Sequence, residues 1–157
     1  MTMSWKIVDL DVREILRRKE DPFETIMAAV EQLGEKDVLQ IHATFRPMPL
    51  ITKLQTRGLA HAMIEEAPDH IIVQFYQDKT SLPYFHLDNR NLEPPQPMVR
   101  TLAMLEQEPQ CQNGTMGVEI WNERVPALLL PELDERSFTY EVVKEAESFV
   151  RLRIIHA

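Results

Sequence analysis

The sequence predicts an α+β protein made of two tandem two-layer α/β sandwiches, each with the element order βαβαββ and with two helices on one face of a mixed four-stranded sheet. Three observations predict this fold class. The chain repeats itself, because Pro22 and Pro94 are matching positions 72 residues apart and Arg57 and Arg136 are matching positions 79 apart. Alternating and helical apolar spacings follow one another in the same order in both halves. Each half has roughly 70 residues, which is enough for a small domain.

In the first half, each element has its own signal. Asp21 is a good N-cap and Pro22 fits the first helical position, so a helix is predicted to begin there. Gly34 ends that helix, and Arg57-Gly58 ends a later one. Residues 17–20 are predicted to be a surface connection. In order, the expected elements are a strand over 7–13, a helix over 22–33, a strand over 38–43, a short helix containing Leu50, Ile51 and Leu54, and strands over 59–65 and 71–76.

The second half repeats that order. Its expected elements are a strand over 85–90, a helix over 95–106, a strand over 116–121, a helix over 128–136, and strands over 138–143 and 149–155. The predicted domains are therefore residues 1–77 and 85–157, joined by a polar, proline-containing linker over 78–84. The single cysteine, Cys111, lies in a polar, turn-like segment and is predicted to be an incidental loop thiol.

Composition excludes several classes of function. The net charge of −8 and the scattered basic residues argue against nucleic-acid binding. No apolar run approaches the roughly 18 residues that a membrane helix needs, so we expect no membrane association. The first six residues do not look like a secretory signal, and a cytoplasmic location is expected by default.

Residues 87–97, Leu-Asp-Asn-Arg-Asn-Leu-Glu-Pro-Pro-Gln-Pro, resemble the signature of the TusA/SirA-like sulfur-carrier fold. In that signature a Cys-Pro-x-Pro sequence opens the first helix. The Asp21-Pro22-Phe23 start and the segment from His42 to Leu50 resemble more closely a bacterial family, domain of unknown function 2249. Together the two resemblances cover nearly the whole chain and imply a duplicated TusA-like fold. They also imply an association with bacterial respiratory and nitrogen-oxide metabolism.

The resemblance also shows which chemistry is missing. In the sulfur carriers a persulfide forms on the cysteine at the start of the first helix, whereas Pro94 occupies that position here and Pro22 occupies it in the first half. Proline has no nucleophilic atom, so the sulfur-relay reaction cannot be carried over. No catalytic cluster, glycine-rich phosphate loop or metal-ligand motif replaces it, and we predict no catalytic residue, no metal and no cofactor.

Candidate binding residues in the first half surround its proline-rich loop. His42 ends a strand on the face away from the helices, and Arg46 and Met48 lie in the loop that follows. Met48, between two prolines, is the one methionine whose position suggests exposure. His42 has two interpretations, a ligand-contacting imidazole or an ordinary strand histidine. Its counterpart is Trp121, which argues against a metal site built on the repeat symmetry.

Candidate binding residues in the second half are expected on the open face of its sheet, namely Arg90, Trp121, Arg151 and Arg153. An aromatic ring among arginines and carboxylates is common in protein interfaces. The alternative is that the two repeats cover each other's open faces. Asp88 with Arg90, and Asp11 with Arg13, are two residues apart on predicted strands and form either an anion site or a structural ion pair.

Two functions from different classes follow. The first is a non-catalytic binding or adaptor protein, linked to redox, respiratory or sulfur and cofactor metabolism, that presents a surface to a protein partner. The second is a small-ligand, metal or haem protein that uses a cleft between the repeats near His42. The edge strands and open faces are also compatible with a homodimer.

Overall fold

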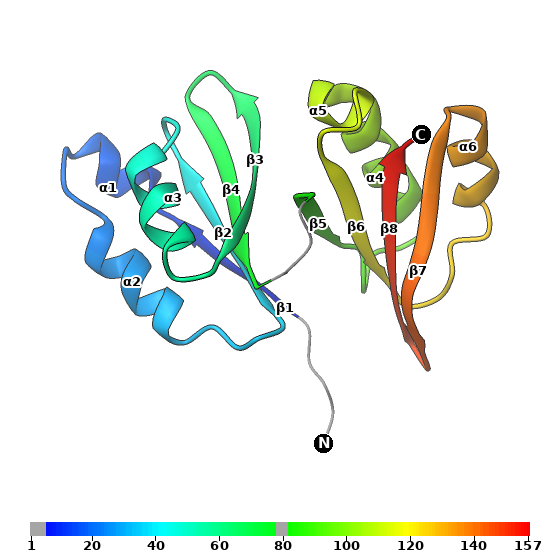
Figure 1. The fold of residues 1–157 in the computed structure, drawn as a ribbon, viewed down its shortest axis with the longest axis horizontal. Coiled ribbons are helices and arrows are strands. Elements are labelled where there is room, and N and C mark those ends of the chain that lie inside the picture. The colour runs from blue at the N-terminus through cyan, green and yellow to red at the C-terminus, as the bar shows by residue number, and fades with distance from the viewer. Residues whose placement is uncertain (1–5, 78–81) are drawn as a thin grey trace. The chain divides into compact units, whose positions relative to one another are not determined.

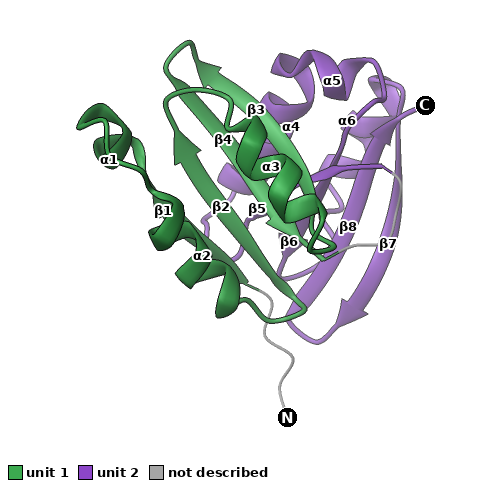
Figure 2. Cartoon of the chain, turned by 60° about the vertical axis from the view of Figure 1, so that its left-hand side comes forward, with its two compact units in different colours: residues 1–81 green, residues 82–157 purple. Residues whose placement is uncertain are grey.

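The computed structural model describes residues 6–77 and 82–157, and the chain divides into two compact units, Met1–Ser81 and Leu82–Ala157 (Figure 2). Each unit has a mixed four-stranded sheet with helices, so the predicted α+β class with two similar sandwich units is confirmed. Most of the predicted linker, residues 78–84, falls on residues 78–81, which lie outside the described residues. The N-terminal residues 1–5 lie outside them as well.

Unit 1 has helices α1, α2 and α3 beside its sheet, as Figure 1 shows. Its described elements are β1 (Lys6–Asp11), α1 (Arg13–Arg17), α2 (Phe23–Glu31), β2 (Asp37–Ala43), α3 (Met48–Gln55), β3 (Ala60–Ala67) and β4 (His70–Tyr76).

Unit 2 has the same succession of strands and helices, except that its additional short helix follows the long helix instead of preceding it. Its described elements are β5 (Tyr84–Asp88), α4 (Gln96–Gln107), α5 (Pro109–Gln112), β6 (Gly117–Asn122), α6 (Leu129–Glu135), β7 (Phe138–Ala146) and β8 (Phe149–His156).

The two sheets have the same topology, with strand orders β1-β2-β4-β3 and β5-β6-β8-β7. In each sheet the first two strands are parallel, and the remaining neighbours are antiparallel. Asp11 lies opposite His42 at the end of one parallel pair, and Asp88 lies opposite Trp121 at the end of the other. A parallel pair needs a crossover connection, and here the crossover contains the first helices of each unit. The carboxyl ends of the parallel strands therefore meet at one edge of each sheet.

The core of unit 1 forms where its helices cover one face of the sheet. The Oδ1 atom of Asp21 accepts a hydrogen bond from the backbone N–H of Phe23 at 2.9 Å, which satisfies a free donor at the start of α2. From there the helical spacing buries Ile26 and Met27 against Leu39 of β2. Gly58 follows the end of α3 with a φ of 85°, the left-handed conformation that glycine adopts easily after a helix.

The core of unit 2 uses matching positions. Leu105 of α4 and Leu133 of α6 are completely buried, as are Ile120 and Leu152, which pair across β6 and β8. Leu133 is the counterpart of Leu54, which is also completely buried in unit 1. Matching leucines therefore hold α3 against the sheet of unit 1 and α6 against the sheet of unit 2.

Two short helices were not predicted. Helix α1 begins at Arg13, where a strand was expected, because the carboxylate of Asp11 accepts the Arg13 N–H at 3.0 Å and the backbone turns. Ile15 and Leu16 then pack against the core. Helix α5 occupies the predicted loop around Cys111, which is completely buried, so the expectation of an incidental loop thiol was wrong. Both helices are too short for their apolar residues to show a clear period.

Candidate functional site

The same polar turn ends the first strand of each unit. The carboxylate of Asp11 accepts hydrogen bonds from the backbone N–H of Arg13 at 3.0 Å and from its Nη2 at 2.7 Å. Asp88 accepts the same two bonds from Arg90, at 3.1 Å and 2.8 Å. The side-chain hydrogen bond from Arg13 holds the pKa of Asp11 well below its usual range. The predicted structural ion pairs are confirmed, although both arginines lie just beyond the strands.

A pocket lies beside this turn in unit 1, at the carboxyl ends of β1 and β2. We call it the unit 1 pocket, and its volume is about 310 Å³. Val12 and Ala43 line it from the strand ends, Pro22 from the start of α2, and Pro47 from the loop before α3. Ligands of α/β proteins bind preferentially in a crevice outside the carboxyl ends of parallel strands.

Unit 2 has a pocket at the matching place, with a volume of about 730 Å³. We call it the unit 2 pocket. Asn89 and Asn122 line it from the ends of β5 and β6, Pro94 from the segment before α4, and Pro126 from the loop before α6. Pro22 and Pro94, the matching prolines of the two halves, thus each line a pocket. In both units a pocket forms where the first helix starts and the strand-end loops meet.

The two pockets differ in the chemistry of their floors, by which we mean, in unit 2, the lining residues Asn89 and Asn122 together with Thr101, which Asn89 contacts, and in unit 1 the matching residues. In unit 2 the Nδ2 atom of Asn89 donates to Oγ1 of Thr101 at 3.1 Å and to Oδ1 of Asn122 at 3.2 Å. All three side chains are buried. The matching positions in unit 1 are Val12, Ala29 and Ala43, none of which carries a polar side chain. Unit 1 therefore has an apolar floor, and unit 2 has a polar one.

Large apolar side chains are exposed around both pockets. Phe45 lines the unit 1 pocket and is 55% exposed. Leu92 and Leu128 line the unit 2 pocket, and Leu128 is 81% exposed. Exposed apolar side chains that gather at a concave site are typical of a binding surface rather than of ordinary solvent-facing structure.

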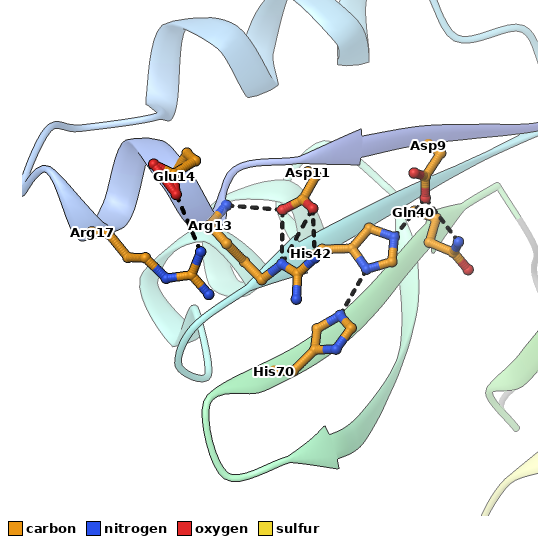
Figure 3. A network of polar contacts seen from close by, with 8 residues as sticks. All are labelled: Asp9, Asp11, Arg13, Glu14, Arg17, Gln40, His42 and His70. Carbon is orange, nitrogen blue, oxygen red and sulfur yellow. Dashed lines mark hydrogen bonds and ion pairs between the residues drawn. The ribbon is translucent and has the colours of Figure 1, made fainter.

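His42 lies in a polar network on the other face of the unit 1 sheet (Figure 3). Its Nε2 lies 2.7 Å from Oδ1 of Asp9, and its Nδ1 lies 2.9 Å from Nε2 of His70. Because a carboxylate only accepts, Nε2 of His42 carries the proton of the first contact, and the second contact holds one proton between Nδ1 of His42 and Nε2 of His70. Burial lowers the pKa of His70, with a smaller effect of Arg13, which favours its neutral ring. Both ring nitrogens of His42 are therefore engaged.

The sequence prediction did not link His70 to His42. The register places His42 opposite Ile72 of β4, so His70, two residues away, shares its face. Arg46 and Met48 follow His42 in the chain. Met48 was expected in the loop but is the first residue of α3, and its predicted exposure is confirmed at 52%. Among residues 6–77 and 82–157, no group of three or more His, Cys, Asp or Glu side chains is placed to hold a metal ion.

The remaining predicted residues gather around a buried carboxylate, that of Glu119. Arg151 and Arg153 reach it at 3.0 Å and 2.9 Å, and the Trp121 indole N–H donates to it at 2.7 Å. Burial alone would raise the pKa of Glu119, but the charges of His86 and Arg151 and the hydrogen bonds from Arg151 and Trp121 lower it to about 2.

Trp121 was predicted to lie on the open face of the unit 2 sheet. Its ring is completely buried, and the Arg90 guanidinium lies 5.5 Å from the ring centre. An arginine at this distance over an indole face is attracted by the ring. The four predicted residues of unit 2 are therefore brought together, but as a structural cluster around Glu119. Whether the repeats cover each other's sheet faces stays a prediction.

The only thiol of the chain is buried, and we expect it to be unreactive. Burial, and to a lesser degree the charge of Glu108, raise the pKa of Cys111 to about 12. Because the thiolate is the nucleophile, we expect iodoacetamide at about pH 8 to alkylate the folded chain at least ~1,000-fold more slowly than the urea-unfolded chain. Mass spectrometry of timed samples measures both rates. Similar rates in the two states would show that this thiol is accessible.

The residues of the unit 2 pocket floor were missed by the sequence prediction. A usable signal was present, because alignment of the two halves places Asn89, Thr101 and Asn122 against Val12, Ala29 and Ala43. A polar residue at a position that is apolar in the other repeat marks either a surface or a site. Only the structure shows that these three are buried together.

The fold and the two pockets define each unit as a two-layer α/β sandwich with a pocket at the carboxyl ends of its parallel strands. Residues 9–77, nearly all of the described part of unit 1, match the model of the family described as uncharacterized conserved protein (DUF2249). No curated protein and no solved structure gives a significant match. In the described part of the chain, no helix has both the length and the apolar character needed to span a membrane.

Proposed function

We propose that this protein is a non-catalytic binding module that recognises a protein partner through the pockets of its two units. The observation that carries the proposal is the pair of pockets at matching places, each lined by the proline that stands at the cysteine position, Pro22 or Pro94. The pocket is present in both units, but the proline in each pocket offers no nucleophile. Such a site is suited to binding rather than to covalent chemistry.

The surroundings of the pockets support a protein partner. Exposed Phe45, Leu92 and Leu128 offer apolar surface at the pockets. Apolar anchors around a concave site are what protein interfaces use for most of their binding energy. Because the net charge is −8, the partner is not expected to be a nucleic acid.

The resemblance to TusA/SirA-like carriers adds a context for this partner. It implies two cysteine-less domains of the DUF2249 type, in a bacterial protein connected with redox, respiratory or sulfur and cofactor metabolism. A cytoplasmic location belongs to the same proposal. The alternative, a ligand, metal or haem protein with its site near His42, would require one of the two His42 contacts, to Asp9 or to His70, to break.

Capture from the organism that produces the protein tests this function. We expect the tagged chain to retain a specific partner, and the triple variant Phe45→Ala, Leu92→Ala, Leu128→Ala to lose at least ~90% of it, since hot-spot residues dominate binding. The control is Val99→Ala with Val143→Ala, which removes two exposed apolar side chains that line neither pocket.

Two outcomes would contradict the proposal. One is equal retention of the partner by the pocket variant and the control. The other is a turnover activity of the purified chain that disappears on His42→Ala or Arg90→Ala, because the protein would then be an enzyme and not a non-catalytic binding module.

A further inference from the structure

Asn89 is a buried side chain with an unused hydrogen-bonding atom. It is 2% exposed, it lines the unit 2 pocket, and its Oδ1 is buried without a hydrogen-bond partner among the described residues. A buried acceptor without a partner is costly, typically by about 1–3 kcal/mol, so few of them persist in native proteins.

The neighbouring hydrogen bonds fix which end of the Asn89 amide is unused. Thr101 donates its hydroxyl proton to the carbonyl oxygen of Pro97 at 2.8 Å, so its Oγ1 can only accept from Asn89. Both protons of Asn89 Nδ2 are then occupied, by Thr101 and by Asn122. The atom left over is an acceptor, and it needs a donor.

Asn122 supplies the complementary group. Its Oδ1 accepts from Asn89 at 3.2 Å, and its Nδ2 makes no hydrogen bond within the described part of the chain. Asn89 and Asn122, which both line the unit 2 pocket, therefore leave one acceptor and one donor unused. A carboxamide carries both complements, an N–H donor and a carbonyl acceptor.

The charges at this pocket argue for a neutral ligand. Glu123 and Arg124, which carry opposite charges, both line it. The carboxylate of Asp88, which precedes Asn89, is already paired with Arg90 at 2.8 Å. A buried ammonium group at Asn89 would thus lack a dedicated counter-charge and would be disfavoured. The prolines and aliphatic side chains of the walls suit an apolar body.

We propose that the unit 2 pocket binds a carboxamide group carried on an apolar body, held by Asn89 and Asn122, whereas the unit 1 pocket does not select for it. This inference rests on the proposed function and names the chemistry that one of its two pockets recognises. The carboxamide comes either from the side chain of a glutamine or asparagine in the protein partner or from a free small molecule.

Titration of the ¹⁵N-labelled full chain tests the inference with benzamide and N,N-dimethylbenzamide, which differ in having or lacking an N–H donor. We expect benzamide to shift the signals of Asn89 and Asn122 and to bind roughly 3- to 10-fold more tightly than its dimethyl analogue, because only benzamide can donate to the buried Oδ1. The signals of Val12 and Ala43 in unit 1 should show no such preference.

Variants that copy unit 1 provide the matched test. Asn89→Val copies the one matching residue Val12, and the triple change Asn89→Val, Thr101→Ala, Asn122→Ala gives unit 2 the floor that unit 1 already has. Both should lose the preference for benzamide, and the triple variant leaves no polar partner unsatisfied if the single variant folds poorly. Gln107→Ala, which removes an exposed carboxamide from α4, should keep the preference.

The source of the carboxamide is decided by two peptides, acetyl-Leu-Gln-Leu-amide and the same peptide with methionine in place of glutamine. Tighter binding of the glutamine peptide than of benzamide assigns the group to a protein partner, and the reverse assigns it to a small molecule.

Equal affinity for both benzamides, a preference that survives Asn89→Val, or no shift at Asn89 up to ~10 mM probe would overturn the inference. The last result would mean that Oδ1 holds a water only. Partner capture through Phe45, Leu92 and Leu128 does not depend on Asn89, so the proposed function would stand or fall separately.

Discussion

Replacing Glu119 with alanine is expected to lower the free energy of unfolding by about 3–5 kcal/mol, the usual result of removing one partner from a buried ion pair. Glu119 is completely buried, and its carboxylate contacts Arg151, Arg153 and the indole of Trp121. The variant would leave two largely buried guanidinium groups without this counter-charge. Urea unfolding followed through the signals of unit 2 measures the change.

The control for this prediction is Glu132→Ala, which removes a partly exposed carboxylate that pairs with Arg136. Surface ion pairs contribute about 0–1 kcal/mol, so this variant should unfold close to the wild type. Similar losses in Glu119→Ala and Glu132→Ala would show that the buried cluster adds little to stability.

The same carboxylate gives unit 2 a pH dependence in acid. The pKa of Glu119 is lowered from 4.5 to about 2 in the folded chain, so the stability from this group is complete above about pH 4.5. It is lost as the pH falls toward 2, because the unfolded state then binds the proton first. The variant Glu119→Gln lacks this contribution. The unfolding free energies of the wild type and of this variant should therefore converge between pH 4.5 and 2, and a constant difference would contradict the pKa.

The second large effect is expected at Leu54 and Leu133, the matching leucines that hold α3 and α6 on their sheets. Each side chain is completely buried, so truncation to alanine removes apolar burial and leaves a cavity. Leu54→Ala and Leu133→Ala should each cost about 2–5 kcal/mol. Hydrogen exchange of unit 1 amides for the first variant, and of unit 2 amides for the second, measures the loss in the unit that carries the change.

Leu128→Ala is the matched control, because this leucine lies just before α6 and is 81% exposed. Its truncation should change stability by less than about 0.5 kcal/mol. If Leu133→Ala were equally mild, the structural equivalence of the two leucines would not be supported, and the repeat would be one of sequence more than of packing.

Much of the fold could be predicted from the sequence, since its signals are local. Strand β2 was expected over 38–43 and spans Asp37–Ala43, and α4 was expected over 95–106 and spans Gln96–Gln107. Strand alternation and helical spacing involve residues that are close together in the chain, so both patterns can be recognised from the sequence alone. Helices α1 and α5 were missed because Arg13–Arg17 and Pro109–Gln112 are each one turn or little more.

The candidate site was predicted less well. The sequence singled out Pro22 and Pro94 as positions without a nucleophile, and it found the Asp11 to Arg13 and Asp88 to Arg90 pairs. It singled out Trp121 but not Glu119, and the structure shows that both side chains are completely buried. Alternation indicates which residues share a face, but the depth of that face depends on groups far away in the chain.

By itself, then, the sequence determined the α+β class, the similar order of strands and helices in the two halves, and the absence of a cysteine at both helix starts. Only the tertiary structure decided which polar side chains meet in the interior. Asn89 follows β5, Thr101 lies in α4 and Asn122 ends β6, and the three meet at the floor of the unit 2 pocket because the carboxyl ends of parallel strands converge there. The physical reason is the range of the forces that produce each pattern: hydrophobic spacing and helix capping act between near neighbours in sequence, whereas burial and pairing of a polar group depend on residues that folding alone brings together.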